Sequence, residues 1–234
     1  MKLFVFCIFA ALCGIQVTSA ANGLQILVQG IRKLKTNTND IIQDLQRYQN
    51  TLVRELERKV HDRKFQSISE INTITNSALK DIEAAVAKAK GEGKDASSCE
   101  TSAKSSLREL SLAAFKNWDE KSKSSVATLD PVLKNIESVI SAAKNSLIYL
   151  DSIVPGCISS NTWATQSCVA GKLPAAHQTL KSLQSSSDLV KRTGTSLSND
   201  AYQDVFRYSL QSTSDFRTNT VNIRLGVNRC IETA

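Results

Sequence analysis

Residues 130–157 read DPVLKNIESVISAAKNSLIYLDSIVPGC and contain a helix whose two ends are both marked. Asp130 supplies a side-chain acceptor for the first free amides, and Pro131 removes an amide that a helix start leaves without a partner. Apolar residues then recur every three or four positions: Val132, Ile136, Val139, Ile140, Ala143, Leu147, Leu150 and Ile153. Pro155-Gly156 ends the pattern, and Cys157 follows directly. This stretch predicts an amphipathic helix with a cysteine at its end.

Four cysteines lie beyond the first 20 residues, and their spacing is nearly symmetric. Cys99, Cys157, Cys168 and Cys230 are separated by 57, 10 and 61 residues. Each long gap fits two helices and a turn, with arms of about 26 residues that would be about 39 Å long. Turns are expected near 125–130 and 194–199, close to the middle of each gap. The spacing predicts an all-α fold, an antiparallel bundle of long amphipathic helices with all four cysteines at one end.

An even number of widely spaced cysteines predicts two disulfides that clamp this end of the bundle. Zinc is the weaker interpretation, because there is no C-x-x-C pair and neither histidine stands at ligand spacing from a cysteine. The pairing of Cys99 with Cys157 and of Cys168 with Cys230 is favoured, since each bond would close a hairpin of roughly 60 residues. The nested pairing, Cys157 with Cys168 and Cys99 with Cys230, remains open.

The start of the chain predicts export. Lys2 precedes an apolar run over 3–15 and small residues up to Ala20, a pattern typical of a secretory signal peptide cleaved after Ala20, with Ala21 as the alternative position. The run is shorter than the roughly 20 residues that span a bilayer. We therefore expect a secreted, extracellular protein without a transmembrane anchor. Cys7 and Cys13 would leave with the signal peptide at 1–20.

Two further apolar stripes precede the first retained cysteine. One runs from Leu27 to Val60 with a polar gap at 36–39, and the other runs from Phe65 to Ala89. Both have helical spacing, and Gly91-Glu92-Gly93 marks the end of the second. The sequence therefore predicts an N-terminal helical hairpin over 21–92, followed by the four-cysteine helical bundle over 96–234.

The signal peptide, the serine- and alanine-rich helical composition and the four cysteines resemble the insect secreted TsetseEP-domain family. The resemblance covers roughly the stretch from Cys99 to Cys230 and leaves the residues before Gly91 outside. It implies an extracellular insect protein with two disulfides and no established chemistry.

The chain is mildly basic, but its basic residues are not arranged as in a nucleic-acid-binding protein. The formal net charge is +7, and removal of the signal peptide leaves 28 basic and 22 acidic residues. No basic run is dense enough for a nucleic-acid arm, and aromatic residues are scarce. The densest basic stretch comprises Arg58, Lys59, Arg63 and Lys64. We interpret it as a solvated turn or, alternatively, as a contact for anionic glycans, lipid head groups or a microbial surface.

Motifs that would predict an enzyme are absent from the sequence. There is no H-E-x-x-H, no glycine-rich phosphate loop and no calcium loop. His61 and His177 have no partner for acid-base chemistry visible in the sequence. Trp118 and Trp163 fit core packing, or a cap over the disulfide end, better than a ligand pocket. We therefore predict no catalytic residues, no metal and no cofactor.

These observations favour a secreted structural or interaction module at an extracellular surface. Its partner would be an extracellular protein, glycan or lipid. The alternative is a carrier of lipid or another apolar ligand, because amphipathic helices can separate and lay their apolar stripes on a lipid particle.

Overall fold

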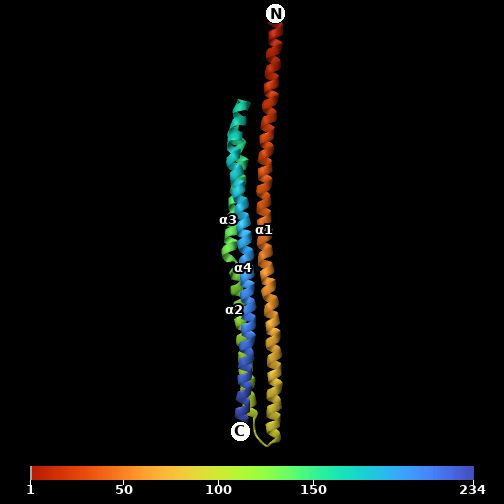
Figure 1. The fold of residues 1–234 in the computed structure, drawn as a ribbon, viewed down its shortest axis with the longest axis vertical. Helices are drawn as coiled ribbons and strands as arrows, with labels where there is room; N and C mark the ends of the chain where they lie inside the picture. Colours follow the sequence, from red (N-terminus) through yellow and green to blue (C-terminus); the bar gives the residue numbers. More distant parts are fainter. Residues whose placement is uncertain (1) are drawn as a thin grey trace. The chain divides into compact units, whose positions relative to one another are not determined.

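The computed structural model describes the backbone of residues 2–234 and the side chains of residues 22–234. It contains four α-helices in chain order: α1 (Lys2–Gly91), α2 (Ser97–Ala127), α3 (Asp130–Ile153) and α4 (Thr162–Thr233) (Figure 1). A short 3-10 helix, η1 (Pro155–Cys157), precedes α4. Over the described residues there is no strand, and the all-α prediction is confirmed. The predicted signal peptide falls outside the part whose side chains are described.

The chain divides into two compact units. Unit 1 comprises Met1–Thr51 and Pro131–Gly194, and unit 2 comprises Leu52–Asp130 and Thr195–Ala234. Each unit therefore contains three helical segments: one from α1, one from α4, and either α3 in unit 1 or α2 in unit 2. The predicted boundary between 92 and 96 is wrong, because both units draw on residues from either side of it.

The core of unit 1 is a continuous apolar cluster contributed by all three of its segments. Its fully buried members include Leu45 of α1, Ile136 of α3 and Val169 of α4. The hydroxyl of Tyr48 donates a 2.6 Å hydrogen bond to the carbonyl of Lys191, so a polar group at the edge of this core is satisfied. The stripe identified in residues 130–157 therefore faces the interior, as its spacing predicts.

The core of unit 2 combines a cluster rich in small apolar side chains with buried hydroxyl groups. Its apolar cluster near the α1–α2 connection contains Ala78, Ala89, Ala103 and several larger residues. Elsewhere in the unit the hydroxyls of Ser67 and Ser209 share a buried 2.7 Å hydrogen bond. Small side chains let helices approach closely, and a paired hydroxyl avoids the cost of a buried polar group without a partner.

The hairpin predicted over 21–92 is wrong, because these residues all belong to the single helix α1, apart from Glu92 just beyond its end. The polar gap at 36–39 does not interrupt it. Thr38 is buried there, and its hydroxyl donates a 2.8 Å hydrogen bond to the carbonyl of Leu34 one turn earlier. Such back-bonding satisfies the hydroxyl inside a helix, so a polar residue is accommodated without a turn.

The turn predicted at 194–199 is also wrong. Both Gly194 and Pro174 lie inside α4, which continues to Thr233. A glycine inside a helix costs about 1 kcal/mol relative to alanine. Burial of Val190, Ala201 and Val205 on either side of Gly194 outweighs that local preference.

Other helix ends agree with the sequence. α1 ends at Gly91, and Gly93 in the connection has a φ of +84°, a conformation that favours glycine. α3 begins at Asp130, where the Asp-Pro pair predicts it. At the start of α2 the carboxylate of Asp95 accepts a 3.2 Å hydrogen bond from the Ser97 amide. Hydrogen bonding from Ser97 holds the pKa of Asp95 below its ordinary value.

Candidate functional site

The four cysteines form two disulfides, one in each unit. Cys99 in the first turn of α2 pairs with Cys230 near the end of α4 in unit 2, with Cα atoms 5.8 Å apart. Cys157 pairs with Cys168 in unit 1, with Cα atoms 5.6 Å apart. The presence of two disulfides is confirmed, whereas their predicted location at one end of one bundle is wrong.

The favoured pairing, Cys99 with Cys157 and Cys168 with Cys230, is also wrong; the nested alternative is the one observed. Cys168 and Cys230 belong to the same helix, α4, with 61 residues between them. At about 1.5 Å of rise per residue, two such positions cannot approach to disulfide distance. Cys99 and Cys157 in turn belong to different units, because α2 and α3 do not form a hairpin within one bundle.

The four basic residues predicted as an anionic-surface contact do not form one patch. They lie within α1 in unit 2, and not in a turn. The Lys59 ammonium lies 5.8 Å from the ring centroid of Tyr202, and the Arg63 guanidinium lies 4.4 Å from that of Phe206. Both cations therefore face aromatic side chains of α4, which stabilise them through the negative face of the ring.

Lys64 and Arg58 point to other neighbours. Lys64 forms an ion pair with Asp119 of α2, and the exposed Arg58 lies 3.9 Å from Asp62 on its own helix. Successive residues of a helix are rotated by about 100°, so these sequence neighbours are distributed around its circumference. Their role as a combined anionic contact stays a prediction without a shared surface to support it.

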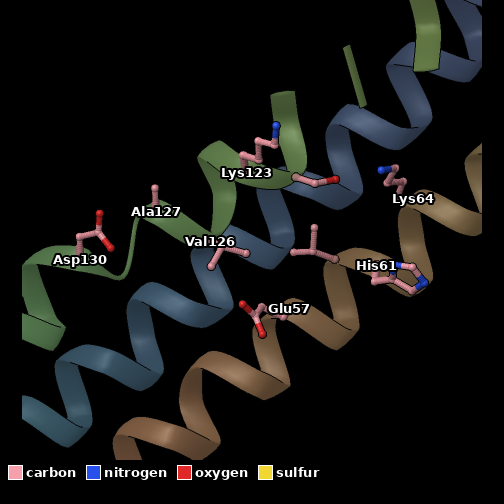
Figure 2. A pocket seen from close by; sticks show the side chains of 9 residues that line it. Glu57, His61, Lys64, Lys123, Val126, Ala127 and Asp130 are labelled. Carbon is pink, nitrogen blue, oxygen red and sulfur yellow. The ribbon is translucent and has the colours of Figure 1, made fainter. Parts of the chain in front are cut away.

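A groove between α1 and α2 in unit 2 brings together ionisable groups that are far apart in the sequence. Its volume is about 560 Å³, and it is lined by Glu57, Val60, His61, Lys64, Ser122, Lys123, Val126, Ala127 and Asp130. Figure 2 shows Glu57 and His61 extending from α1, and Lys123 and Val126 from the facing end of α2. Helix spacing places Glu57, His61 and Lys64 on one side of α1, since residues three or four apart are neighbours.

The groove combines charges of both signs with an apolar floor. Val60 is buried at its base, and Val126 is half-buried. Glu57, His61, Lys123 and Asp130 are exposed, and none of them has an ion-pair partner within residues 22–234. Lys64 is already paired with Asp119 at the margin. Four side chains are therefore free to pair with a ligand or partner protein that carries both signs of charge.

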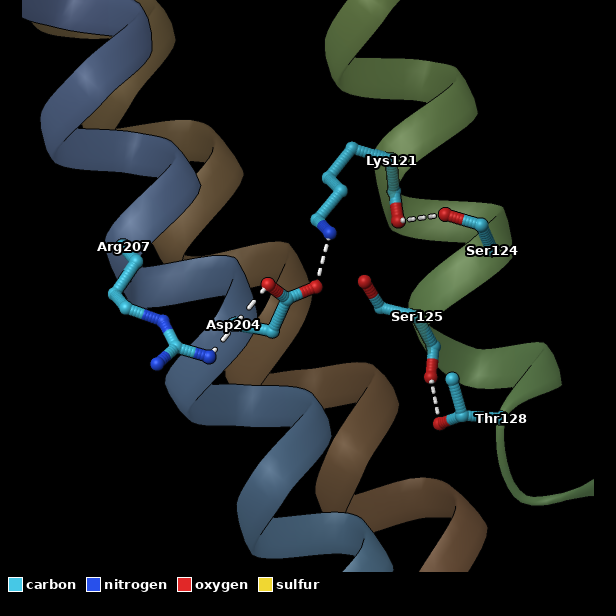
Figure 3. A network of polar contacts seen from close by, with 6 residues as sticks. All are labelled: Lys121, Ser124, Ser125, Thr128, Asp204 and Arg207. Carbon is cyan, nitrogen blue, oxygen red and sulfur yellow. Dashed lines mark hydrogen bonds and ion pairs between the residues drawn. The ribbon is translucent and has the colours of Figure 1, made fainter.

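A network of polar contacts joins α2 to α4 beside the core of unit 2 (Figure 3). Lys121 forms an ion pair with Asp204, and Arg207 lies 3.9 Å from the same carboxylate. The hydroxyl of Thr128 donates a 2.7 Å hydrogen bond to the carbonyl of Ser125 and so satisfies the last turn of α2. We assign this network a structural role, because its charges are paired within the unit.

Two carboxylates of unit 2 make its stability decrease as the pH falls into the acid range. A hydrogen bond from Lys121 holds the pKa of Asp204 below its ordinary value, and Lys64 does the same for Asp119. Because these pKa values are lower in the folded chain, the stabilisation is present above about pH 4 and is lost as the pH falls. We expect the thermal midpoint of Asp204→Asn, followed by circular dichroism, to fall less between pH 6 and pH 3 than that of the parent chain.

The matched control is Asp188→Asn, since Asp188 is exposed and makes no ion pair among the described residues. Its midpoint should follow the parent chain across the same pH range. An equal acid-induced fall in the Asp204 variant and the parent would contradict the assigned role of the Lys121–Asp204 pair.

The two tryptophans have opposite environments. Trp118 is fully buried in unit 2, with its ring edge-on to Tyr208 at a centroid distance of 4.9 Å. The prediction of core packing is confirmed for Trp118. Trp163 is 70% exposed in unit 1, so it does not pack in the core. Burial raises the pKa of the Tyr208 phenol.

Residues that would support metal or acid-base chemistry are dispersed. His61 and His177 are both exposed, in unit 2 and unit 1 respectively. A group of three or more histidine, cysteine or acidic side chains able to hold a metal ion is not found among the described residues. Within the same residues, no helix combines the length and hydropathy required to cross a membrane.

Comparisons with known proteins leave the family of this chain undetermined. No protein-family model matches it, and no curated protein matches it. Among solved structures, the haptoglobin-hemoglobin receptor of Trypanosoma congolense is similar, with a TM-score of 0.34 and 12% sequence identity over 92% of this chain and 95% of that chain. A similarity at this level carries no argument about function. The resemblance to the TsetseEP-domain family stays a prediction.

Proposed function

We propose that the chain is a secreted, non-enzymatic helical module that binds an extracellular partner through the groove between α1 and α2. The observation that carries this proposal is the set of four exposed, unpaired ionisable side chains around an apolar floor. Side chains with structural roles elsewhere in the unit, such as Lys121 and Asp204, are paired with each other. The groove adds to its unpaired charges a volume of about 560 Å³ with an apolar floor, into which side chains of a partner can fit.

The mixture of charges favours a protein segment as the partner. An anionic glycan would be attracted by Lys123 and repelled by Glu57 and Asp130, which line the same groove. A peptide segment with both basic and acidic side chains can pair with the acidic and the basic residues of the groove. An apolar side chain of the same segment can cover Val60 and Val126. We therefore expect the order of charges along the partner segment, as well as its shape, to determine whether it binds.

Extracellular action is supported by the cysteines. Two disulfides fit an oxidising compartment, and the predicted signal peptide and the TsetseEP-like spacing agree with export. Carriage of lipid by separating helices is the less supported alternative. Cys99–Cys230 ties α2 to α4 in unit 2, which limits how far these two helices can part.

Zero-length coupling of carboxylates to amines tests the groove even while its partner is unidentified. A carbodiimide links only groups already close enough to form an ion pair, so we expect coupled peptides from native secretions to contain Lys123, Glu57 or Asp130. The exposed Lys181 of unit 1 serves as the reference position. Coupling concentrated at Lys181, or spread evenly over exposed lysines, would contradict the proposal.

A charge reversal provides the second measurement. Lys123→Glu combined with Asp130→Lys keeps the net charge and reverses the order of charges along the groove. We expect the retention of the protein by its coupled partner to fall at least about tenfold, as for the loss of two complementary pairs. Lys181→Glu should leave retention within about twofold of the parent chain.

A further inference from the structure

Among the residues whose side chains the structure describes, one end of unit 1 is free of charged side chains. Residues 152–171 contain no Asp, Glu, Lys, Arg or His, and neither do residues 22–31. The two segments lie at the same end of the unit, because a side chain at Gly23 would meet the amide of Gln166. In a chain with 22% charged residues, a neutral surface built from two distant segments is a distinct feature.

The loop within this end is braced from inside. The Cys157–Cys168 disulfide closes it. The Asn161 side chain accepts a 2.9 Å hydrogen bond from the Trp163 amide, and the Thr165 hydroxyl accepts a 3.0 Å hydrogen bond from the Ser159 amide. The polar side chains of the loop therefore stabilise its conformation.

Large apolar side chains project from this neutral end into solvent. Ile158 is 75% exposed, Trp163 is 70% exposed and Ile26 is 67% exposed. A braced loop that holds a tryptophan and an isoleucine in water keeps apolar area available, and burying that area elsewhere would release free energy.

Basic residues surround the neutral end where it meets the rest of the unit. Arg32 and Lys33 follow the uncharged part of α1 and are exposed, and Lys172 follows the uncharged part of α4. In the described part of the chain these three cations have no ion-pair partner, whereas the nearby Lys35 is paired with Asp151. The end thus has an apolar neutral tip and a positive margin.

We propose that this end of unit 1 docks on the surface of a zwitterionic phospholipid layer. Trp163 and Ile158 enter the boundary between head groups and acyl chains, where tryptophan is enriched, and no charged side chain has to be desolvated. Arg32, Lys33 and Lys172 then lie at the level of the lipid phosphates, so the positive margin is complementary to them.

A lipid surface suits the tip better than a protein partner. The three exposed apolar side chains carry no charge, and the unpaired cations Arg32, Lys33 and Lys172 lie behind them. This order matches a lipid surface, where the acyl chains lie beneath a layer of phosphates. This docking uses residues of unit 1 only, so it does not depend on the proposed partner-binding groove in unit 2.

The two tryptophans make the docking measurable. Trp118 is buried, so a change of emission on adding vesicles reports Trp163. The probe is a vesicle of pure phosphatidylcholine, mixed with processed protein that begins at Ala21, because the apolar run at 3–15 would itself bind lipid. We expect a blue shift of the emission, loss of quenching by acrylamide, and co-sedimentation that persists in high salt.

Matched variants distinguish binding through the tip from non-specific binding through any exposed apolar side chain. Ile158→Ala with Trp163→Ala should lower co-sedimentation at least about tenfold, since two exposed apolar side chains are removed. Phe65→Ala, which removes an aromatic side chain that is 67% exposed in unit 2, should bind like the parent chain. Lys123→Glu with Asp130→Lys should also bind normally, which distinguishes a failure of this proposal from a failure of the groove.

Three results would overturn the proposal. The first is an absence of co-sedimentation and of any emission shift with phosphatidylcholine, which is also the outcome if the tip docks on a protein. The second is an equal loss of binding in the Phe65 variant. The third is binding that needs anionic lipid and disappears in high salt, which would assign it to the net positive charge of the chain.

Discussion

Replacing both Cys99 and Cys230 with serine is expected to lower the free energy of unfolding by about 5 kcal/mol, from the entropy of closing so long a loop. The bond joins residues 131 positions apart and ties the first turn of α2 to the end of α4. Without it, the unfolded chain gains the freedom to separate these two segments. Cys157 and Cys168 are only 11 positions apart, so their removal should cost about 3 kcal/mol.

Urea unfolding followed by far-ultraviolet circular dichroism measures this difference. In the processed chain that begins at Ala21, the Cys157→Ser/Cys168→Ser variant is the matched control, because it also removes one disulfide and leaves no free thiol. The Cys99→Ser/Cys230→Ser variant should likewise show no free thiol when unfolded. An equal loss of stability in the two variants, or two free thiols in either, would contradict the assigned pairing and its energetics.

Truncation of Trp118 to alanine is expected to destabilise the protein by about 3–5 kcal/mol. Its side chain is fully buried, and the loss includes the edge-on contact with Tyr208 as well as a cavity too large for neighbouring side chains to fill. Because the indole nitrogen has no hydrogen-bond partner among the described residues, Trp118→Phe sacrifices no such bond and should cost less.

Thermal and urea unfolding of the Trp118 variants provide the measurement. Trp163→Ala is the internal comparison, since it removes the same side chain from a position that is 70% exposed. Its unfolding free energy should stay within about 0.5 kcal/mol of the parent value. A larger cost for Trp163→Ala than for Trp118→Ala would show that the packing described for unit 2 is incorrect.

Local chemistry explains why several helix ends can be predicted. The pair Asp130-Pro131 marks a helix start through the preferences of its own two residues, and Gly91-Glu92-Gly93 ends α1 through backbone preferences of the same few residues. Such signals do not depend on distant segments. They therefore locate the start of α3 and the end of α1 correctly.

Long-range packing explains the errors. Glycine weakens a helix locally, so Gly194 predicts a turn, yet it is buried in the middle of a continuous α4. Once α4 is continuous, the hairpin that would join Cys168 to Cys230 cannot form. Four cysteines allow three pairings, and their symmetric spacing does not decide among them. The continuous α4 excludes the pairing that joins Cys168 to Cys230, and the structure contains Cys99–Cys230 and Cys157–Cys168.

The candidate sites show the same difference between what local residues predict and what depends on long-range packing. The disulfide-forming residues can be named from composition and the predicted compartment, because four cysteines in a chain predicted to be exported have few other uses. The residues of the groove cannot be named from the sequence, because the groove forms only where Lys123 of α2 faces Glu57 and His61 of α1. The spacing of Glu57 and His61 by one helical turn is the available signal, and nothing in the sequence shows which helix faces them.

A tryptic map without reduction tests most directly the division into two units, each closed by its own disulfide. Cleavage after lysine and arginine places Cys99 in peptide 95–104, Cys230 in peptide 230–234, and both Cys157 and Cys168 in peptide 145–172. The structure predicts peptide 95–104 linked to 230–234, and peptide 145–172 alone with two hydrogen atoms fewer than its reduced form. A single species joining all three peptides would contradict it.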